Sequence, residues 1–395
     1  MGKLERYIQG DKAIWGLVIL LSLFSFLPVY SASSNLVYVV GTGSVVTHLF
    51  KHTFIVCIGV VIMYAVHRVP FRYFAGLSMI GLPIVIVLLL YTSLQGNTID
   101  GANASRWINI PLLGVSFQTS TLAIVVLMVY TARYLASKKD STIRFIESIV
   151  PFWIPVSLVL ILILPSNLST AALLFVFVFM LLFLGGYPLK YLLFMVSVGI
   201  VFLVLFVLIS KSFPDLLPNR VDTWTSRIES FVGEGNSNTD YQIERAKTAI
   251  ATGGIVGNGA GKSVMKNLLP QSTSDFIFAI IAEEYGLLGS LSLLFVYLLL
   301  LFRIFISAYK QKSFFGQLLI LGVGFPVIMQ AFINMGVAVA IFPVTGQPLP
   351  LISSGGTSMW MTFLALGIVL SVTANREVSS EKTEENPIAV LSETV

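Results

Sequence analysis

Residues 276–302 read FIFAIIAEEYGLLGSLSLLFVYLLLLF, and this stretch decides the fold class. A helix needs about 20 apolar residues to cross the roughly 30 Å of hydrocarbon in a bilayer. Charge interrupts this run only at Glu283 and Glu284. The run is continuously apolar, whereas a transmembrane β-strand alternates between apolar and polar residues. We therefore predict a membrane-spanning helix here.

The whole chain has the composition of a membrane protein. Of its 395 residues, 56% are hydrophobic and 11% are charged, whereas a soluble domain carries about 25% charged residues. We predict an all-α polytopic membrane protein with about ten transmembrane helices in a single domain, residues 1–375. Nine or eleven spans remain possible, because two of the runs are short. The predicted spans are 13–30, 53–67, 74–92, 117–136, 149–164, 168–186, 189–210, 276–302, 315–340 and 353–374.

The distribution of Lys and Arg predicts the orientation. Short loops rich in these residues face the cytoplasm. With the N-terminus inside, nearly all of those in short loops fall on the inner side, and only Lys51 and Arg106 fall on the outer side. We predict two cytoplasmic termini, a large extracytoplasmic loop at 211–275 and a disordered cytoplasmic tail at 376–395. Within the loop, residues 240–252 (DYQIERAKTAIAT) have the pattern of a short helix.

Three carboxylates gather around QSTSDFIFAIIAEEYG, residues 271–286. Asp275 is placed at the outer boundary of its span, where an aspartate either caps the helix or serves as a general base. Glu283 and Glu284 would lie about 12–14 Å deeper on a helix. A charged side chain there costs about 2.5–3.5 kcal/mol on insertion scales. At least one of the two must therefore face protein, either in a structural hydrogen bond or ion pair, or in a functional role.

A glycine-rich stretch precedes these carboxylates. GNGAGKS, residues 257–263, lacks the first glycine of a phosphate-binding P-loop, because Val256 stands at that position. We therefore predict no ATP site. The glycines still allow backbone amides to approach an anion, and a flexible hinge is the alternative.

Three other polar or irregular features also predict structural or functional roles. His48 and His52 share one face of a helix, and we predict a solvated or interfacial pair because no further zinc ligand lies nearby. Arg106 is either an interfacial anchor or an anion contact. FPVTGQPLPLISSGGTS, residues 342–358, predicts a rigid, non-helical segment that is either packed in protein or lines a cavity.

The outer side thus combines one boundary carboxylate with several cations and a rigid loop. This combination suits a substrate that carries a lipid-linked pyrophosphate. Cations stabilise the charge of a departing pyrophosphate, so a single base that activates an acceptor hydroxyl would complete the chemistry. Deep glutamates and spans interrupted by proline and glycine are also typical of a transporter. A lipid-linked-precursor flippase therefore remains the alternative, although the two halves show no repeat.

Two stretches carry a resemblance to a known family. GGIVGNGAGKSVMKNLLPQSTSDFIFAIIAEEYGLLG, residues 253–289, and NMGVAVAIFPVTGQPLPLISSGGTS, residues 334–358, resemble the SEDS proteins (shape, elongation, division and sporulation), the group of FtsW and RodA. The resemblance extends to about residue 375. It implies a ten-helix peptidoglycan glycosyltransferase of the bacterial inner membrane, with its active site on the outer face. The turn at 344–360 resembles the division branch, which acts in septal wall synthesis, more than the elongation branch.

The resemblance also implies substrate and partners. The substrate would be lipid II, a disaccharide peptide linked to undecaprenyl pyrophosphate. The partners would be a class B penicillin-binding protein, which is a transpeptidase, and other membrane proteins of the division machinery; no nucleic acid is implied. A divalent cation, Mg²⁺ or Mn²⁺, is compatible with this chemistry, but the sequence contains no dedicated ligand set.

Individual site residues follow from matching the family's motifs. Asp275 in SDFIFA matches the catalytic aspartate, and Glu283 matches the first glutamate of the EE-G pattern, with Glu284 beside it as a supporting residue. Gln271 stands where many members have glutamate. On the fourth span, Thr121 and Ile124 replace an acid and a lysine, so both members of a possible ion pair are absent. The predicted substrate-binding residues are Arg106, Arg227, Ser263, Lys266, Gln271, Gly355 and Gly356.

Overall fold

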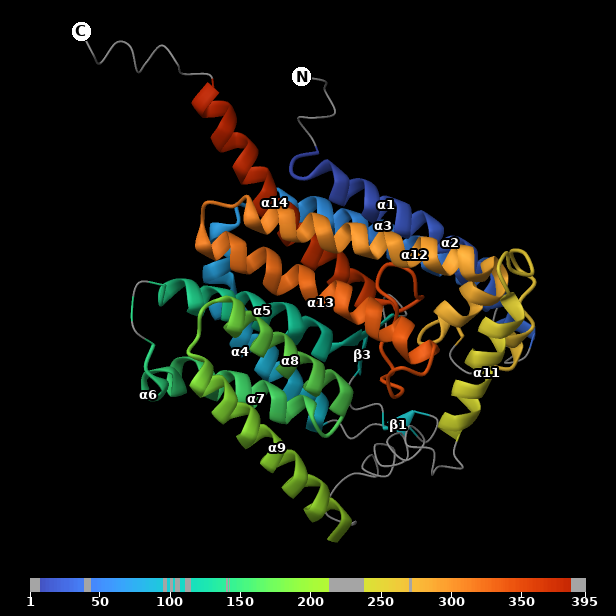
Figure 1. Ribbon diagram of the computed structural model, residues 1–395, viewed down its shortest axis with the longest axis horizontal. Helices are drawn as coiled ribbons and strands as arrows, with labels where there is room; N and C mark the ends of the chain where they lie inside the picture. The colour runs from blue at the N-terminus through green and yellow to red at the C-terminus, as the bar shows by residue number, and fades with distance from the viewer. Residues whose placement is uncertain are drawn as a thin grey trace.

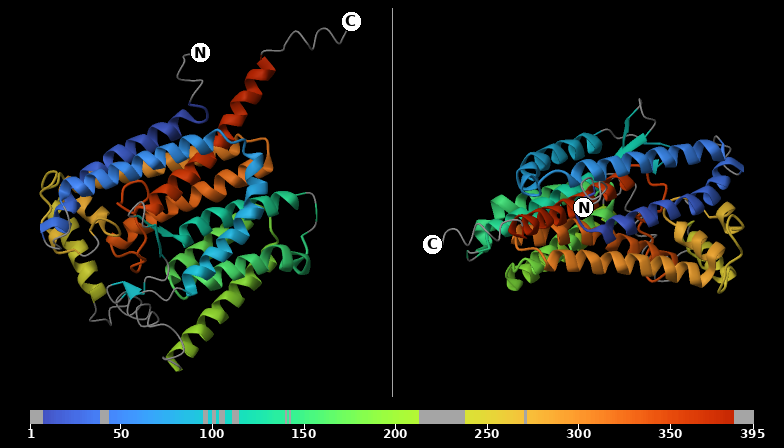
Figure 2. Two further views of the ribbon diagram at one scale, coloured as in Figure 1. Left: turned by 180° about the vertical axis from the view of Figure 1, so that it is seen from behind. Right: turned by 90° about the horizontal axis from the view of Figure 1, so that it is seen from above.

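The computed structural model describes residues 8–38, 44–94, 98–99, 102–103, 107–110, 115–139, 141, 143–212, 238–269 and 272–384. Within these residues, eight helical segments are long and apolar enough to cross a membrane, and two shorter apolar helices lie at Leu168–Leu184 and Leu189–Phe202. The helices run roughly side by side and form one bundle (Figures 1 and 2). The prediction of an all-α polytopic membrane protein is confirmed.

The first span consists of two helices, α1 (Lys12–Phe24) and α2 (Phe26–Tyr38). They meet at Ser25, whose Oγ donates to the carbonyl of Ser22 at 2.6 Å and contacts Nε2 of His52 at 2.8 Å. A serine hydroxyl that bonds to a carbonyl of the preceding turn competes with the helical ladder. His52 is fully buried, so the expectation of a solvated or interfacial histidine is wrong for it, because the break at Ser25 supplies a buried partner.

Three further helices and two hairpins follow. α3 (Val45–His67) packs along α14 (Thr357–Glu384), and a Cβ added to Gly59 would lie 2.0 Å from the Phe363 ring. Two small antiparallel strand pairs lie between α4 (Arg72–Leu94) and α5 (Thr119–Ser137). They were not predicted from the sequence. Their strands are β1 (Thr98–Ile99), β2 (Ala102–Asn103), β3 (Trp107–Ile110) and β4 (Val115–Gln118).

The fifth predicted span is divided into three pieces: α6 (Phe145–Ser148), the π-helical turn η1 (Ile149–Trp153) and α7 (Ile154–Ile163). Pro151 lies inside the π turn, and proline widens a helix because it lacks an N–H and its ring crowds the preceding turn. The hydroxyl of Tyr130 on α5 donates to the Pro151 carbonyl. α8 (Leu168–Leu184) and α9 (Leu189–Ser212) complete this half of the bundle.

The C-terminal half begins with α11 (Asn238–Gly253), which confirms the helix predicted at 240–252. After the short 3₁₀ helix η3 (Met265–Asn267) come α12 (Ile277–Tyr309) and α13 (Phe314–Ala338). α14 continues to Glu384, nine residues beyond the predicted end of the domain at residue 375, and its end projects from the bundle (Figure 1). Arg, Glu and Lys are good helix formers, which accounts for the extension. Residues 385–395 lie outside the described part.

Candidate active site

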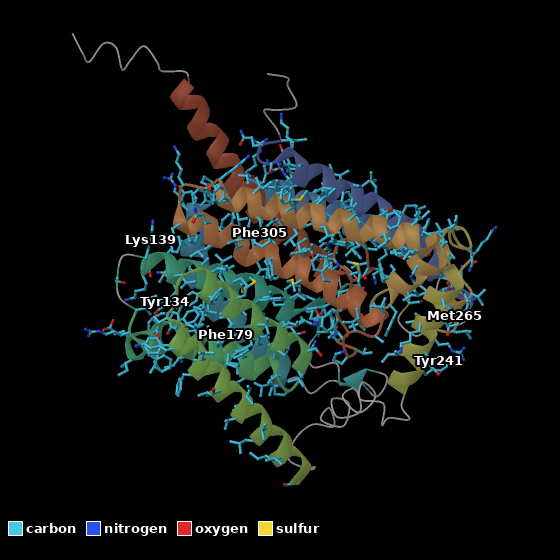
Figure 3. The ribbon with its side chains drawn as sticks, viewed as in Figure 1. Tyr134, Lys139, Phe179, Tyr241, Met265 and Phe305 are labelled. Atoms are coloured by element: carbon cyan, nitrogen blue, oxygen red, sulfur yellow. The ribbon has the colours of Figure 1, made fainter. Side chains whose placement is uncertain are left out.

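The bundle has two distinct ends. α11 and the loop before α14 lie at one end, and Figure 3 shows Tyr241 and Met265 there. Tyr134 and Lys139 lie at the opposite end, toward which α14 also extends (Figures 1 and 3). The predicted site residues that the structure describes all belong to the end that carries α11. The described site residues therefore lie at one end of the bundle.

Asp275 lies in the turn at 272–276, directly before α12, and its side chain is half-buried. The helix begins at Ile277, and Phe276 takes the N-cap position. The capping role considered for Asp275 is therefore not realised. Instead, the turn is fixed through its backbone: Nδ2 of Asn334 on α13 donates to the Asp275 carbonyl at 2.8 Å.

The same turn is joined to the segment before α14. The backbone N–H of Ser354 donates to the carbonyl of Thr273 at 3.1 Å, and Oγ of Ser353 donates to the carbonyl of Ser274 at 2.6 Å. With the Asn334 contact, three consecutive carbonyls, those of Thr273, Ser274 and Asp275, are held from outside the turn. The backbone of the turn that carries Asp275 is therefore held by two other segments and not by α12 alone.

The segment at 347–356 is rigid for a related reason. Its prolines lack N–H groups, so the local carbonyls need other donors. Side chains of the surrounding helices supply them: Asn334 to Gln347 at 2.7 Å, Gln330 to Pro348 at 3.0 Å, and the Tyr297 hydroxyl to Pro350. Nε2 of Gln347 in turn donates to Thr170 on α8 at 2.8 Å. The predicted rigid segment is confirmed, and it is packed against α8, α12 and α13.

Two glycines close this segment. The N–H of Gly355 donates to the carbonyl of Ser353 at 2.7 Å, and the N–H of Ser358 donates to the Gly355 carbonyl at 3.0 Å. Gly356 has φ of +49°, a left-handed conformation that favours glycine. The backbone therefore turns sharply into α14 beside Ser353 and Ser354, the two residues that hold the Asp275 turn.

Glu283 is buried, and both oxygens of its carboxylate accept hydrogen bonds from the end of the glycine-rich stretch. It accepts from the Ser263 hydroxyl and from the N–H groups of Val264, at 2.9 Å, and of Met265, at 3.3 and 3.4 Å. These N–H groups begin the 3₁₀ turn η3 and have no partner within it, as at any helix start. Glu283 therefore stabilises η3 in the manner of a capping carboxylate supplied by a distant helix.

Glu284 connects the same stretch to the first span. Its Oε1 accepts from the Ser31 hydroxyl of α2 and from the Ser263 N–H at 3.3 Å. Nζ of Lys266 contacts the Ser31 hydroxyl at 3.3 Å and donates to the Gly261 carbonyl at 2.8 Å. Ser31 was not singled out from the sequence, because only the packing of α2 on α12 brings it here. Ser263 and Lys266 thus make contacts that position the loop.

The glycine-rich stretch is not a flexible hinge, because it pairs with α12 along its backbone. The helical geometry of α12 is interrupted at Gly286, with φ of 65° and ψ of −165°. At this break, the N–H groups of Leu287 and Leu288 donate to Gly254 and Ile255 at 2.9 and 3.1 Å. In return, the N–H groups of residues 258 and 259 donate to the carbonyls of residues 283 and 284 at 3.0 and 2.9 Å.

Glycine is required by this close approach. A Cβ at Gly257, where φ is +88°, would lie 2.2 Å from the Glu284 carbonyl oxygen, and one at Gly253 would lie 2.0 Å from the Ala282 oxygen. These glycines therefore allow a close approach to the backbone of α12, whereas the predicted approach to an anion stays a prediction.

Three predicted substrate-binding residues, Arg106, Arg227 and Gln271, lie outside the described residues. Among the residues that are described, no group of three or more His, Cys, Asp or Glu side chains could hold a metal ion.

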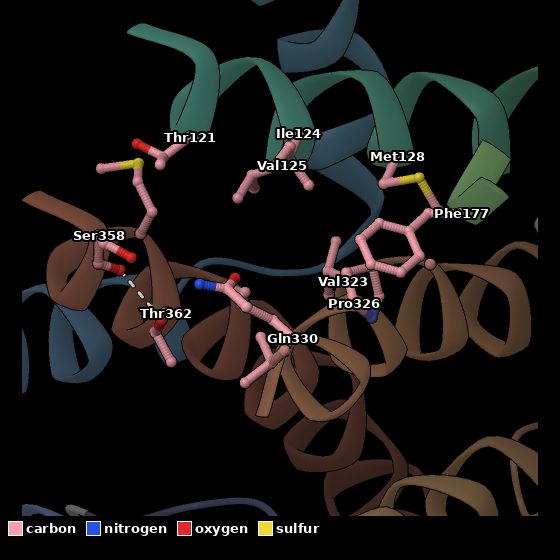
Figure 4. A pocket seen from close by; sticks show the side chains of 14 residues that line it. Thr121, Ile124, Val125, Met128, Phe177, Val323, Pro326, Gln330, Ser358 and Thr362 are labelled. Carbon is pink, nitrogen blue, oxygen red and sulfur yellow. Dashed lines mark hydrogen bonds between the residues drawn. The ribbon is translucent and has the colours of Figure 1, made fainter. Parts of the chain in front are cut away.

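Thr121 and Ile124 stand where the family has an acid and a lysine. They lie beside a small cavity of about 40 Å³ between α5, α8, α13 and α14. Thr121, Ile124 and Gln330 contribute to its lining (Figure 4). Thr121 donates to the Gln118 carbonyl at 2.7 Å and Ile124 is apolar, so the absence of both ionisable residues leaves no buried charge unpaired here.

Fold and site together define a polytopic membrane protein with one boundary carboxylate, held by a rigid loop and adjoined by a glycine-rich segment. The chain belongs to the cell cycle protein family of FtsW, RodA and SpoVE, whose model matches residues 11–378. A probable peptidoglycan glycosyltransferase FtsW of Enterococcus hirae is 30% identical over 390 residues, which cover 95% of each chain. One of Thiomicrospira cyclica is 35% identical over 312 residues, 76% of each chain.

Solved structures have the same fold. A chain from a peptidoglycan synthase complex that coordinates polymerization and crosslinking superposes with a TM-score of 0.70 at 25% identity, covering 93% of this chain and 98% of that one. The rod shape determining protein RodA of Thermus thermophilus gives a TM-score of 0.66 at 24% identity, covering 94% of this chain and 99% of that one. The bundle described above is thus the architecture of this family.

Proposed function

We propose that this protein is a peptidoglycan glycosyltransferase of the division branch, which polymerises lipid II into glycan strands at the outer face of the bacterial inner membrane. The observation that carries the proposal is the fixed turn of Asp275, because the three carbonyls at 273–275 are all held by α13 and by the segment at 353–354. The proposal is further supported by relatives that are named peptidoglycan glycosyltransferases over most of the chain.

In the proposed reaction the Asp275 carboxylate acts as general base. It accepts the proton of the sugar 4-hydroxyl of one lipid II as that oxygen attacks the anomeric carbon of the lipid-linked donor. The new carbon–oxygen bond forms as the bond from the anomeric carbon to the pyrophosphate oxygen breaks. Undecaprenyl pyrophosphate leaves with the bonding electrons. A positioned base contributes roughly 10²–10⁴-fold to such a step.

The remaining site residues have supporting roles in this proposal. Arg106 and Arg227 neutralise the pyrophosphates, since arginine keeps its charge and offers five donors. Gln271 precedes the Asp275 turn in the sequence, and Gly355 and Gly356 follow the residues at 353–354 that hold it; all three contact the substrate in this proposal. Ser263 and Lys266 hold the glycine-rich stretch against Glu283 and Glu284, so their proposed contribution to substrate binding is through the shape of that stretch.

The topology follows from the same proposal. Both termini are cytoplasmic, residues 211–275 form an extracytoplasmic segment, and the family domain ends near residue 375. A class B penicillin-binding protein crosslinks the strands that this chain makes, which agrees with the resemblance to a chain of a peptidoglycan synthase complex.

Polymerisation from labelled lipid II by the purified protein with its transpeptidase tests the proposal. Asp275→Asn removes the base, and we expect glycan polymer to fall by about 10²-fold or more. Glu244→Gln is the matched control: this exposed acid lies on α11 at the same end of the bundle, and its loss should leave polymer formation unchanged. Equal polymer from the parent and from Asp275→Asn would refute the assignment of the base.

The flippase alternative was motivated by the deep glutamates. Their carboxylates accept hydrogen bonds from Ser263, Ser31 and backbone N–H groups, so a structural role accounts for their burial. Movement of lipid II across vesicles without any polymer would nevertheless favour a flippase over the polymerase.

A further inference from the structure

α12 consists of two parts that differ in their surroundings. Before the break at Gly286, every residue from 276 to 284 is buried in protein. After the break, residues 287–309 are about 34 Å long at 1.5 Å per residue, which is enough to cross the roughly 30 Å of hydrocarbon in a bilayer. One face of this second part is apolar and exposed at helical spacing, through Leu288, Leu291, Phe295, Leu298, Phe302 and Phe305. The part of α12 that faces lipid therefore begins directly after Gly286.

The exposed apolar face continues from α12 onto the turn at 254–256, which connects α11 to the glycine-rich stretch. Ile255 and Val256 are 67% and 74% exposed, and Leu287 and Leu288 are 53% and 58% exposed. The N–H of Leu288 donates to the Ile255 carbonyl at 3.1 Å, so the two segments lie side by side. We call these four residues the apolar rim. Exposed apolar groups that adjoin one another mark a surface that contacts another molecule or a membrane.

The backbone at the apolar rim is compatible with an apolar environment. A polar backbone group in hydrocarbon must find its partner within the protein, because no water is available there. At the break, the N–H groups of Leu287 and Leu288 donate to carbonyls of the turn at 254–256. The Gly286 carbonyl accepts from the Ser290 hydroxyl at 2.9 Å. These three backbone groups are therefore satisfied without water.

The chain becomes polar directly after the apolar rim. Asn258 and Lys262 are both exposed, and they follow Val256 within six residues. A segment that lies in a membrane interface presents apolar side chains to the acyl chains and polar or basic side chains to the headgroups and water. The change of polarity along residues 255–262 is of this kind.

We propose that the apolar rim inserts among the acyl chains of the leaflet at this end of the bundle, and that it anchors the glycine-rich stretch to the bilayer surface. Lipid is the occupant because the rim is continuous with the exposed face that α12 keeps along its membrane span. The carboxylates of Glu283 and Glu284, which precede the break, then lie at the membrane boundary. The proposal does not depend on the chemistry at Asp275.

Spin labels test the proposal in the full-length protein, reconstituted in nanodiscs of phosphatidylglycerol and phosphatidylcholine. The one cysteine, Cys57, is replaced by serine, and Val256→Cys is labelled with a nitroxide. Collisions with oxygen, which concentrates in hydrocarbon, and with a Ni²⁺ chelate, which stays in water, are measured by electron paramagnetic resonance. Leu298→Cys, on the exposed face of α12, is the lipid reference, and Glu244→Cys, an exposed acid on α11, is the water reference.

We expect the ratio of oxygen to nickel collisions at Val256→Cys to be at least about threefold above that at Glu244→Cys and no higher than that at Leu298→Cys, because interfacial segments are immersed by about 5–10 Å. Ile255→Cys is an independent second position and should give the same result. A ratio equal to that of the water reference at both positions would show that the rim faces water. Low collision rates with both reagents would show that protein covers it, either a segment of this chain or a second copy. Either result overturns the proposal.

Discussion

Ser31 on α2 and Glu284 on α12 are joined by a hydrogen bond between buried side chains, although 253 residues separate them in the chain. The second carboxylate oxygen, Oε2 of Glu284, has no partner among the described residues. Because Lys266 also contacts the Ser31 hydroxyl, one small side chain of the first span connects α12 to the glycine-rich stretch.

Replacing Ser31 by alanine removes a donor from a buried carboxylate. We expect Ser31→Ala to lower the free energy of unfolding by about 1–3 kcal/mol and to reduce polymer formation, because the stretch at 261–266 loses its contact with α2. Thermal unfolding in detergent, followed by intrinsic fluorescence, measures the first effect. Ser22→Ala is the control, since the Ser22 hydroxyl bonds only to the Val18 carbonyl of its own helix. Equal melting temperatures for the two variants would contradict the prediction.

Glu283 stabilises η3. We therefore expect its substitution to lower kcat by displacing neighbouring residues of the site, and not by removing a reacting group. Glu283→Ala leaves the donors of Val264 and Met265 unsatisfied, and we expect kcat to fall by roughly 10²-fold, the cost of about 1 Å of misplacement. Glu283→Gln keeps one acceptor oxygen and should retain a larger fraction of the activity. The ranking of the two variants by initial rate is the measurement. A general acid–base role would instead make both variants equally inactive.

Gly254 and Gly257 are a matched pair of positions at which the backbone contact between the glycine-rich stretch and α12 can be tested. Both have positive φ, but a Cβ at Gly257 would meet the Glu284 carbonyl oxygen at 2.2 Å, whereas one at Gly254 meets nothing within 4 Å. We expect Gly257→Ala to abolish polymer formation, and Gly254→Ala to cost only the strain of a left-handed alanine, about 1–2 kcal/mol of stability. Similar activities for both variants would show that the stretch need not pair with α12.

The ion pair between Asp11 and Arg303 predicts that the stability of the fold depends on pH. Burial acts to raise the pKa of Asp11, but the hydrogen bond and charge of Arg303, with the Ile14 N–H and the Ser307 hydroxyl, outweigh it and hold the pKa below its ordinary value. A carboxylate with a lowered pKa stabilises the fold at pH values above its ordinary pKa. This contribution is lost as the pH falls through the pKa of the folded state.

The melting temperature of Asp11→Asn should therefore lie a constant amount below that of the parent from pH 7 to about pH 5. The difference should close as the pH falls below about 4. A difference that stays the same at low pH would show that the Asp11 carboxylate contributes no charge-dependent stability.

The spans were predictable because each is a long apolar run, and the position of Asp275 directly before α12 was predictable because it stands where such a run begins. The hairpins between α4 and α5 were not, since strands of two to four residues leave no clear alternation. The role of Glu284 was also hidden, because its partner Ser31 is an ordinary polar residue of an apolar helix. Only the close packing of two distant helices shows that contact.

The first span is attached to α12 near both of its ends, through Asp11 and Arg303 at one end of the bundle and through Ser31 and Glu284 at the other. A helix held at two points cannot slide past its neighbour without breaking one of the two contacts, because each residue of shift displaces the side chains by about 1.5 Å. Bending at Ser25, where α1 and α2 meet, is the remaining freedom of motion. A bend there would displace Ser31 relative to Glu284 and Lys266, the two side chains that it contacts.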